Sequence, residues 1–270
     1  MTFTKKLIQA SRTNNSLLCV GLDVDLDRVP PFLLAEKDVV GAFNRAIIEA
    51  TADLVCAYKP NVAFYEALGE RGWRALHKTR RYVPKEIPII ADAKRGDIGN
   101  TARMYAKAFF EDMDFDAITV NPYMGFDAVE PFVKFGDKCA FVLCLTSNPS
   151  AEEFQRFSIN KRPLFLEVAH KVVAWSQHGS CGLVVGATQA GDLKRVREVA
   201  PQLPILIPGV GAQGGDLAAA VRDGVNESGE LAIINVSRSI LYASAERDFA
   251  HRARQEAMRL RDEINRHRGG

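Results

Sequence analysis

Three charged residues, Asp92, Lys94 and Asp97, follow an apolar run in the stretch IIADAKRGDIGNTA, residues 89–102. Residues two apart on a strand share a face, so we expect Asp92 and Lys94 to point inward while Ala93 packs outward. Flanking carboxylates favour the protonated form of a lysine, because the ion pairs stabilise its charge. The stretch therefore predicts a general acid held by negative charges, which suits a reaction whose carbanion intermediate needs a proton.

Asp92 offers a second contribution to the same chemistry. It would repel a substrate carboxylate placed beside it, and the repulsion would vanish as CO₂ leaves. Such relief counts as catalysis only if other contacts hold the substrate in place. The alternative is a buried salt-bridge triad without catalytic use, although buried ion pairs stabilise proteins poorly.

A glycine-rich stretch, PGVGAQGGD from Pro208 to Asp216, offers exposed backbone N–H groups and conformational freedom. The last apolar run of the chain ends in NVSRSI, which contains Ser237 and Arg238. In (β/α)₈ barrels, the loops after the seventh and eighth strands commonly form a phosphate site at a helix N-terminus. The guanidinium of Arg238 could grip a phosphate with two parallel hydrogen bonds. The stretch therefore predicts a phosphate site, with an ordinary turn as the alternative.

Eight short apolar runs recur along the chain, each followed by a turn and a helical pattern. They are nearly continuous rather than alternating, which is typical of parallel strands covered on both faces. Eight strands alternating with helices in 270 residues predict an α/β protein, a single-domain (β/α)₈ TIM barrel over residues 1–270. A doubly wound open sheet is the alternative, but its usual glycine-rich first turn is replaced here by the acidic GLDVDLDR. The runs begin at Leu17, Leu54, Ile87, Asp116, Cys139, Cys181, Leu203 and Leu231.

Polar residues stand at the C-terminal ends of most of these runs. In a barrel those ends meet at one rim, where active sites are built. Lys59 directly follows the apolar LVCAY, so its side chain must face a polar cavity or a charged partner. The alternative, that strands simply end in polar loops, does not explain a charge inside such a run. The rim residues predicted in this way are Asp23, Lys59, Asp92, Lys94, Asn121, Ser147, Thr188 and Arg238.

The composition is that of a soluble globular protein, with 47% hydrophobic residues and a net charge of +2 that favours no nucleic-acid or membrane partner. The five cysteines lie in or beside apolar runs without framework spacing, which indicates buried thiols in a reducing compartment. We find no signal-peptide core and no apolar run long enough to span a membrane, and therefore expect a cytoplasmic protein. The five histidines lie in helix-like or tail segments without metal-ligand spacing, so neither a metal site nor Ser–His–Asp chemistry is expected.

Taken in order, the strand ends resemble those of the orotidine 5′-monophosphate decarboxylase family. DAKRGDIGNTA resembles the family signature, and seven other strand ends carry matching motifs. The resemblance runs from about Leu17 to about Ala243 and favours the longer bacterial branch of the family. The D-x-K-x-x-D core is shared with related sugar-phosphate enzymes, whereas the ordered set of motifs is highly specific. The other motifs are GLDVD, YKPNVAFYE, VNPYMGFD, LTSNPS, VVGAT, PGVGAQGGD and SRSILYA.

The resemblance implies the decarboxylation of orotidine 5′-monophosphate (OMP) to UMP, the last step of de novo pyrimidine nucleotide synthesis, without a metal or other cofactor. It implies that Lys94 protonates the pyrimidine carbon as CO₂ departs, with Asp92 against the leaving carboxylate. Asp23 and Lys59 match positions that hold the ribose and the charge network. Asp97 would enter the site from the second subunit of a homodimer.

The resemblance also implies substrate contacts around this centre. Ser147 matches the residue that reaches the pyrimidine ring, and Gln213 and Arg238 match the phosphate clamp, with the loop that carries Gln213 closing over the substrate. Ser237 stands where many members have glycine, but it still provides the expected backbone N–H. Ser150 also stands where related sequences often have glycine. The remaining substrate contacts are predicted at Ile98, Thr101 and Pro208, with Ile98 and Thr101 beside Asp97 at the subunit boundary.

Two other functions remain open. A sugar-phosphate decarboxylase or aldolase would have a similar D-x-K-x-x-D core, but it would need an acidic magnesium ligand where this chain has Lys59. A non-catalytic nucleotide-binding barrel would keep the glycine-rich loop and Arg238, but it would not need Lys94 between two aspartates. Turnover separates this last interpretation from an enzyme.

Overall fold

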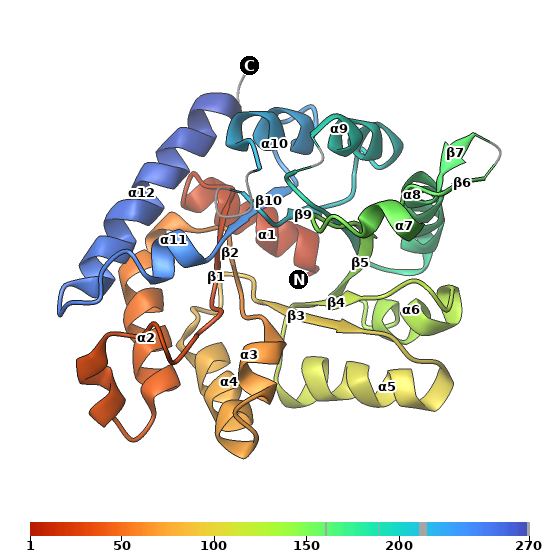
Figure 1. The fold of residues 1–270 in the computed structure, drawn as a ribbon. Coiled ribbons are helices and arrows are strands. Elements are labelled where there is room, and N and C mark those ends of the chain that lie inside the picture. Colours follow the sequence, from red (N-terminus) through yellow and green to blue (C-terminus); the bar gives the residue numbers. More distant parts are fainter. Residues whose placement is uncertain (160, 189, 211–214, 269–270) are drawn as a thin grey trace.

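The computed structural model describes residues 1–159, 161–188, 190–210 and 215–268, and its centre is an eight-stranded sheet (Figure 1). Every ladder within this sheet is parallel, so each connection must cross over from one end of the sheet to the other. The strand order is β2-β1-β10-β9-β8-β5-β4-β3. The strands are β1 (Leu18–Gly21), β2 (Ala57–Lys59), β3 (Ile90–Arg95), β4 (Ala117–Val120), β5 (Cys139–Leu145), β8 (Cys181–Val185), β9 (Ile205–Ile207) and β10 (Ala232–Val236).

Two isolated bridges join the edge strands and turn the sheet into a nearly closed barrel. Tyr58 of β2 pairs in parallel with Ile89, and Asn61 pairs in parallel with Asp92 of β3. A backbone hydrogen bond of 3.0 Å runs from Asp92 N to the Pro60 oxygen. The predicted (β/α)₈ barrel is confirmed, and the open doubly wound sheet is wrong.

The interior of the barrel is filled by a cluster of small and apolar side chains. Alternate residues of each strand point to the barrel axis, while the residues between them face the surrounding helices. This division explains why the strands read as continuous apolar runs, since both faces are covered. The interior cluster consists of Phe3, Leu7, Cys19, Cys56, Ala57, Ile90, Ala117, Cys139, Phe141, Val184, Leu206 and Ile233.

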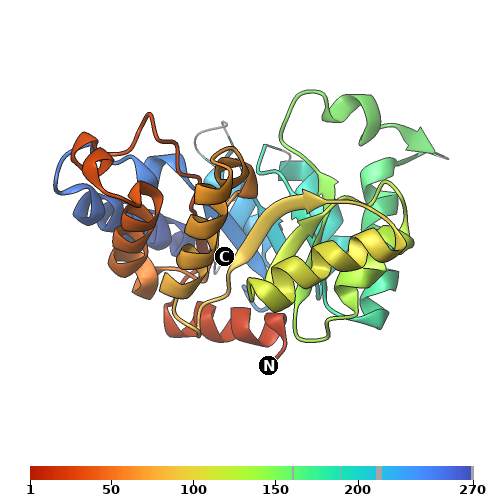
Figure 2. The ribbon, with the colours of Figure 1, turned by 90° about the horizontal axis from the view of Figure 1, so that it is seen from below.

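Helices surround the barrel and bury their apolar faces against the outer side of the strands (Figures 1 and 2). Side-chain caps begin some of them: Asp38 accepts a hydrogen bond from Gly41 N at 3.0 Å, and Asp216 accepts one from Ala219 N at 3.2 Å. The α-helices are α1 (Phe3–Thr13), α2 (Val39–Thr51), α3 (Val62–Glu66), α4 (Glu70–Tyr82), α5 (Gly99–Lys107), α6 (Phe126–Val133), α7 (Ala151–Phe154), α8 (Leu164–Trp175), α9 (Ala190–Val199), α10 (Leu217–Gly224), α11 (Arg238–Leu241) and α12 (Phe249–Arg268); short 3₁₀ or π turns are η1 (Pro31–Ala35), η2 (Ala52–Leu54), η3 (Ala108–Asp112) and η4 (Ser176–His178).

Helix α1 covers the end of the barrel where the strands begin (Figure 2). Phe3 is 1% exposed, and its ring meets that of Phe141 edge to face with 5.4 Å between centroids. Lys6 of the same helix forms a buried ion pair with Asp116, with 2.7 Å between Nζ and Oδ1. This end of the barrel is therefore sealed, and the opposite end is left for a site.

Seven of the eight strands lie inside their predicted runs, and β3 extends one residue beyond its run, to Arg95. The connection after β5 contains elements that the pattern did not indicate. It holds helix α7 and an antiparallel hairpin of β6 (Ser158–Ile159) and β7 (Arg162–Pro163), which projects from the barrel in Figure 1. Two-residue strands leave too short an alternation to be recognised in a sequence.

The bulk properties inferred from the sequence can be compared with the structure in two respects. All five cysteines are buried and free, as their apolar surroundings indicated. Within the described ranges, no helix combines the length and the apolar character that crossing a membrane requires. The single domain over residues 1–270 and the cytoplasmic location stay predictions.

Candidate active site

A cavity of about 470 Å³ opens at the carboxyl ends of the barrel strands, where the sequence predicted the site. Its base has two unlike sides. Strands β5, β8 and β9 contribute the apolar side chains of Leu143, Val184 and Leu206. Acids and lysines from β2, from β3 and from the loop after β1 make up the polar side. The cavity can therefore hold a molecule with one apolar face and one charged face.

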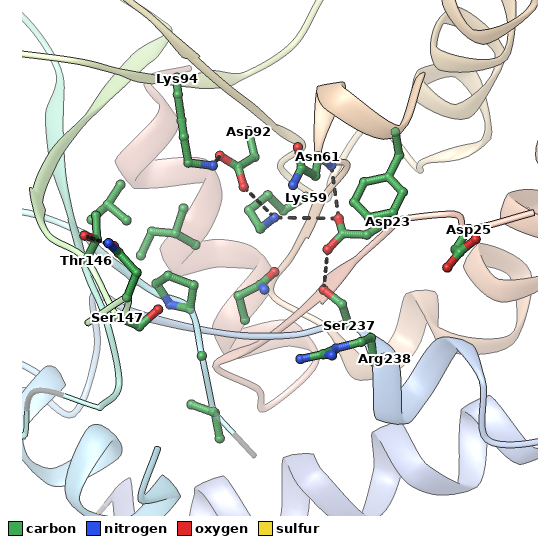
Figure 3. Close-up of a pocket in the computed structure, with 18 of the residues that line it drawn as sticks. Asp23, Asp25, Lys59, Asn61, Asp92, Lys94, Thr146, Ser147, Ser237 and Arg238 are labelled. Carbon is green, nitrogen blue, oxygen red and sulfur yellow. Dashed lines mark hydrogen bonds and ion pairs between the residues drawn. The ribbon is translucent and has the colours of Figure 1, made fainter. Parts of the chain in front are cut away.

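Asp92 lies between two lysines on the polar side of the cavity (Figure 3). Its Oδ2 accepts a hydrogen bond from Lys59 Nζ at 3.0 Å, and its Oδ1 accepts one from Lys94 Nζ at 2.6 Å. The Lys59 side chain is 3% exposed, whereas the Lys94 side chain is 49% exposed. Lys94 is therefore the lysine that is accessible to a substrate, whereas the buried Lys59 holds Asp92 in position.

Asp23, after the end of β1, extends this row of charges along the cavity (Figure 3). Its Oδ1 lies 3.9 Å from Lys59 Nζ and accepts a hydrogen bond from Asn61 N at 3.1 Å. Its Oδ2 accepts a hydrogen bond from Ser237 Oγ at 2.9 Å. Two carboxylates therefore face one buried ammonium group, and each carboxylate is held by a second contact.

The ionisation of this network is set by competition between burial and charge. Burial alone would raise the pKa of Asp92, but the ammonium groups of Lys59 and Lys94 outweigh it and hold that pKa well below the ordinary aspartate value. Burial alone would lower the pKa of Lys59, but Asp23 and Asp92 outweigh it and raise that pKa above the ordinary lysine value. Asp92 therefore stays negative and Lys59 positive across the physiological pH range.

A bulge in β3 brings Lys94 to Asp92. Lys94 has a φ of +46°, in the left-handed region that residues other than glycine rarely adopt. The pairing with β4 shifts register between Ala91 and Arg95, which is typical of a bulge that re-aims a side chain. Thr119 of β4 holds the bulge, because its Oγ1 accepts a hydrogen bond from Lys94 N at 2.9 Å and donates one to Asp92 Oδ1 at 3.0 Å. The two side chains meet as expected, but through this bulge rather than through regular strand alternation.

The loop after β5 brings Ser147 to the cavity wall. Gln155, which follows α7, holds this loop from outside: its Oε1 accepts a hydrogen bond from Thr146 N at 2.7 Å, and its Nε2 donates one to Thr146 Oγ1 at 2.8 Å. Thr146 Oγ1 in turn donates to Asn148 Oδ1 at 2.6 Å. These contacts fix the residues on both sides of Ser147, and no sequence pattern indicated the role of Gln155.

The loops after β9 and β10 form the wall that the sequence predicted to hold a phosphate. Pro208, Ser237 and Arg238 all line the cavity, and Arg238 is the first residue of α11. Gly209 lines it too and has a φ of +94°, a conformation that favours glycine. Gln213, which was predicted for the same clamp, lies outside the described residues.

Asp97, Ile98 and Thr101 are not among the described residues that line the cavity of this chain. They follow β3 and lie at the start of α5, where Ile98 is 54% exposed. The carboxylate of Asp97 accepts a hydrogen bond from Ile98 N at 2.8 Å, which caps the turn locally. Their role at the site of a second subunit stays a prediction.

Several cavity residues were missed by the sequence analysis. The guanidinium of Arg28 lies 4.2 Å from the centre of the Tyr242 ring. The Tyr242 hydroxyl accepts a hydrogen bond from Asp25 N at 2.7 Å and donates one to the backbone carbonyl oxygen of Asp23 at 3.0 Å. It therefore stabilises the loop after β1. The stretch GLDVDLDR showed acids and an arginine but not which of them face inward. Other missed lining residues include Asn61, Phe64 and Asn235.

Metal-ligating side chains do not gather in this cavity in the usual way. Within the described part of the chain, no group of three His, Cys, Asp or Glu side chains could hold a metal ion. Asp23 and Asp92 face each other across Lys59, whose ammonium lies within 3.9 Å of the first and 3.0 Å of the second. The space between these two carboxylates is therefore filled by a positive charge.

The barrel and its cavity define a class of protein: a (β/α)₈ barrel with an Asp–Lys network and an arginine-bearing wall at the carboxyl ends of its strands. Comparisons with known proteins identify the family. The sequence profile described as "Orotidine 5'-phosphate decarboxylase / HUMPS family" matches residues 16–253. The "Orotidine 5'-phosphate decarboxylase" of Dehalococcoides mccartyi is 51% identical over 272 residues, which cover 99% of this chain and 99% of the relative. The chain belongs to this family.

Solved structures give the same result for the fold. The "Structure of Leishmania donovani OMP decarboxylase" is 39% identical, has a TM-score of 0.89 and is covered over 100% of both chains. The "Structure of Leishmania donovani UMP synthase" is 41% identical with a TM-score of 0.90, over 99% of this chain and 57% of that longer chain. This chain is thus similar to the whole of the first protein and to a little over half of the second.

Proposed function

We propose that this chain is a carbon–carbon lyase that converts OMP to UMP and CO₂, the last step of de novo pyrimidine nucleotide synthesis, without a metal. One observation carries the proposal: Asp92 lies between Lys59 and Lys94 in a cavity that Arg238 also lines. This arrangement offers a negative charge beside a departing carboxylate, a proton for a ring carbon, and a cation for a phosphate. The name of the Dehalococcoides mccartyi relative supports the same activity.

In the proposed reaction, the bond between the pyrimidine carbon and the carboxylate breaks, and its electron pair stays on the ring carbon. The carboxylate leaves as CO₂. The ring carbon takes a proton from Lys94 Nζ, and the neutral amine is reprotonated from water afterwards. Atoms and charge balance without an oxidant, a reductant or a Lewis acid.

Asp92 and the two lysines act on different stages of this reaction. Asp92 is held ionised, so it repels the substrate carboxylate in the ground state and no longer does so once neutral CO₂ has formed. Lys94 places a positive charge near the developing carbanion, and its position is fixed before the reaction begins. Lys59 keeps Asp92 in place while the substrate presses against it, since the two are joined at 3.0 Å.

The phosphate of OMP lies far from the bond that breaks, and its role is to supply binding energy. Arg238 and the backbone around Ser237 and Pro208 line the opposite wall and suit a phosphate dianion. Energy from these contacts can hold the substrate carboxylate against Asp92, which would otherwise push it away. Gln213 is proposed to complete the clamp, and Ser147 to contact the pyrimidine ring.

A direct assay tests the proposal. Purified protein is mixed with OMP, with and without a metal chelator, and the ultraviolet absorbance of the pyrimidine is followed. We expect conversion to UMP at the same rate in both samples. A rate abolished by the chelator would favour the metal-dependent sugar-phosphate enzymes instead. No conversion by folded protein would leave a phosphate-binding barrel, to be tested with sugar phosphates and magnesium.

We further propose that the chain works as a homodimer, in which Asp97, Ile98 and Thr101 reach the site of the neighbouring subunit. Large apolar side chains lie exposed on the same part of the surface, as is typical of a protein interface. The turn after β3 and the loop after β4 adjoin, since a Cβ on Gly96 would lie 3.7 Å from the end of the Met124 side chain. The exposed apolar residues of these two segments and of the adjoining helix α5 are Ile98, Met104, Tyr123 and Met124.

A mixing experiment tests the exchange of Asp97 between subunits. Lys94→Ala and Asp97→Ala are purified separately, each with little activity, and are then dissociated and re-associated together. If Asp97 acts in the partner's site, each hybrid dimer contains one complete site out of two. About half of randomly paired dimers are hybrids, so about a quarter of wild-type turnover should return. If Asp97 serves its own subunit, no hybrid contains a complete site, and the absence of recovery would refute the proposal.

A further inference from the structure

The side chain of Asn235 is the least explained polar group in the cavity. Asn235 lies on β10 two residues after Ile233, an interior residue, so both side chains face the barrel axis. It pairs with Cys19 of β1, another interior residue, and it lines the cavity just above the apolar layer. The residues that line the cavity base from β5, β8 and β9 are apolar, so an amide here departs from the local pattern.

The amide oxygen of Asn235 is buried without a hydrogen-bond partner among the described residues. Asn235 is 7% exposed, and its Oδ1 atom is buried and unpaired. A buried acceptor without a partner costs roughly 1–3 kcal/mol, which an apolar residue of similar size would avoid. Gly21 on the neighbouring strand leaves room for the amide, since a Cβ there would lie 3.2 Å from Asn235 Oδ1. The fold thus accommodates a buried acceptor that is unfavourable in the free protein.

We propose that Asn235 is a substrate-binding residue whose carboxamide oxygen accepts a hydrogen bond from the nucleoside part of the bound nucleotide. Two kinds of donor carry this chemistry, a sugar hydroxyl and a ring N–H. A Cβ on Gly21 would lie 3.2 Å from Asn235 Oδ1 and 1.9 Å from Ser237 Oγ, so both groups approach the same point on β1. The amide of Asn235 therefore lies close to the hydrogen-bonded pair of Ser237 and Asp23. A nucleotide that spans the cavity from Lys94 to Arg238 must cross this region. The inference rests on the proposed function, because it takes the occupant to be a pyrimidine nucleotide.

The test replaces Asn235 with leucine, which keeps the volume but removes the acceptor, and with alanine, which cannot clash. The affinity for UMP is measured by calorimetry, turnover of OMP by absorbance, and stability by thermal unfolding. We expect UMP affinity to fall by roughly 10- to 100-fold in both variants, as when a buried donor is left unpaired. We also expect Asn235→Leu to unfold at a higher temperature than the wild type. Ile234→Val, on the outward face of the same strand, is the matched control and should leave affinity unchanged.

A deoxyribonucleotide identifies the donor. If the acceptor binds the 2′-hydroxyl, Asn235→Leu weakens UMP but leaves 2′-deoxy-UMP affinity as in the wild type. If both nucleotides weaken equally, the donor is another group of the nucleoside. UMP affinity within about threefold of wild type in both variants would overturn the inference while leaving the proposed function intact. Wild-type protein that does not turn over OMP would instead overturn the proposed function, whatever the variants do.

Discussion

Two buried lysine–aspartate pairs lie at opposite ends of the same barrel and serve different purposes. At the closed end, Lys6 and Asp116 are joined at 2.7 Å, and both side chains are about nine-tenths buried. Asp116 is also bound to Ile89 N at 2.9 Å, so its second oxygen is occupied. At the open end, Lys59 and Asp92 are joined at 3.0 Å, and a second lysine reaches Asp92 from the cavity. Composition alone would not tell the two pairs apart.

The difference lies in what surrounds each pair. Helix α1 and the interior cluster seal the closed end, so the ion pair there can only hold the helix to the barrel. The open end gathers two aspartates and two lysines around one cavity: Asp23, Lys59, Asp92 and Lys94 all line it. Charges kept beside an open space are costly unless a ligand uses them. A buried ion pair becomes a functional site when a cavity gives it access to a reacting molecule.

The largest effect is expected at the open end, from Lys94→Ala. The change removes both the proton donor and the positive charge nearest the carbanion, so we expect kcat to fall by at least about 10⁴-fold. Because the Lys94 side chain is half exposed, the variant should stay folded. Absorbance assays and circular dichroism measure the two properties. Lys85→Ala, an exposed lysine in the turn before β3, is the control, and full turnover by Lys94→Ala would refute the proton-donor role.

The closed end should respond in the opposite way, with lost stability and unchanged chemistry. Lys6→Met leaves the Asp116 carboxylate buried without its cation, and the free energy of unfolding should fall by about 3–5 kcal/mol. The kcat of the folded fraction should stay at the wild-type value. Denaturant titration and the absorbance assay separate the two properties. Lys5→Met, on the exposed side of the same helix, is the control and should change neither the free energy of unfolding nor kcat. A large loss of kcat in Lys6→Met would contradict the purely structural role of the closed end.

The pH dependence of stability should distinguish the open end from ordinary surface charge. The pKa of Asp92 is lowered in the folded state, so its contribution is present above the ordinary aspartate pKa near 3.8 and is lost as the pH falls toward the lowered value. The pKa of Lys59 is raised, so its contribution is complete below 10.5 and is lost as the pH rises through the folded value. We therefore expect a constant contribution between about pH 5 and 10.

Asp92→Asn measures this contribution. Its deficit in unfolding free energy relative to the wild type should be constant near neutral pH and should shrink below about pH 4, where the unfolded wild-type chain takes up a proton at Asp92 that the folded protein still excludes. Denaturant titrations at several pH values between neutral and about pH 3 follow it. Glu86→Gln, which changes an exposed carboxylate in the turn before β3, should show no such narrowing. A deficit that stays constant down to the lowest pH would mean that the lysines do not hold Asp92 ionised.

The barrel itself was predictable because its signal is repeated and its cause is simple. Strands covered on both faces must be apolar throughout, and this produced eight recognisable runs. The ends of these runs also located the rim, since a lysine after LVCAY has to face a polar space. The hairpin of β6 and β7 was missed because its strands are too short to show a pattern. Helix α1 was missed because only contacts distant in sequence, such as Phe3 with Phe141, reveal that it closes the barrel.

The site was predictable only where charge stood in an apolar run. Lys59, Asp92 and Lys94 met that condition. The bulge that directs Lys94 toward Asp92 could not be predicted in this way. Thr119 on the neighbouring strand holds the bulge, and the residue spacing within DAKRGD does not indicate that contact. Asn235 could have been noticed as the polar residue inside AIINV, a signal of the same kind as Lys59 but weaker, since an amide is cheaper to bury than a charge.

The smallest effect is expected on the wall that carries Ser147. Gln155 makes two hydrogen bonds to Thr146, and Gln155→Leu would leave the Thr146 N–H without its acceptor. The loop would then hold Ser147 less firmly, and kcat/KM for OMP should fall by roughly tenfold, mainly through KM, because the charge network at Lys94 is untouched. Steady-state kinetics measure the split between KM and kcat.

Glu153→Gln, on the exposed side of α7, is the matched control, because it changes the same helix without touching the loop. Gln155→Glu is informative as well, since it keeps the acceptor for Thr146 N but loses the donor to Thr146 Oγ1. If the N–H contact is the important one, Gln155→Glu should retain most of the wild-type kcat/KM. If Gln155→Leu changed kcat as much as KM, the Ser147 wall would contribute to the chemical step. The proposed division, in which this wall binds the substrate and the Asp–Lys network carries out the reaction, would then be wrong.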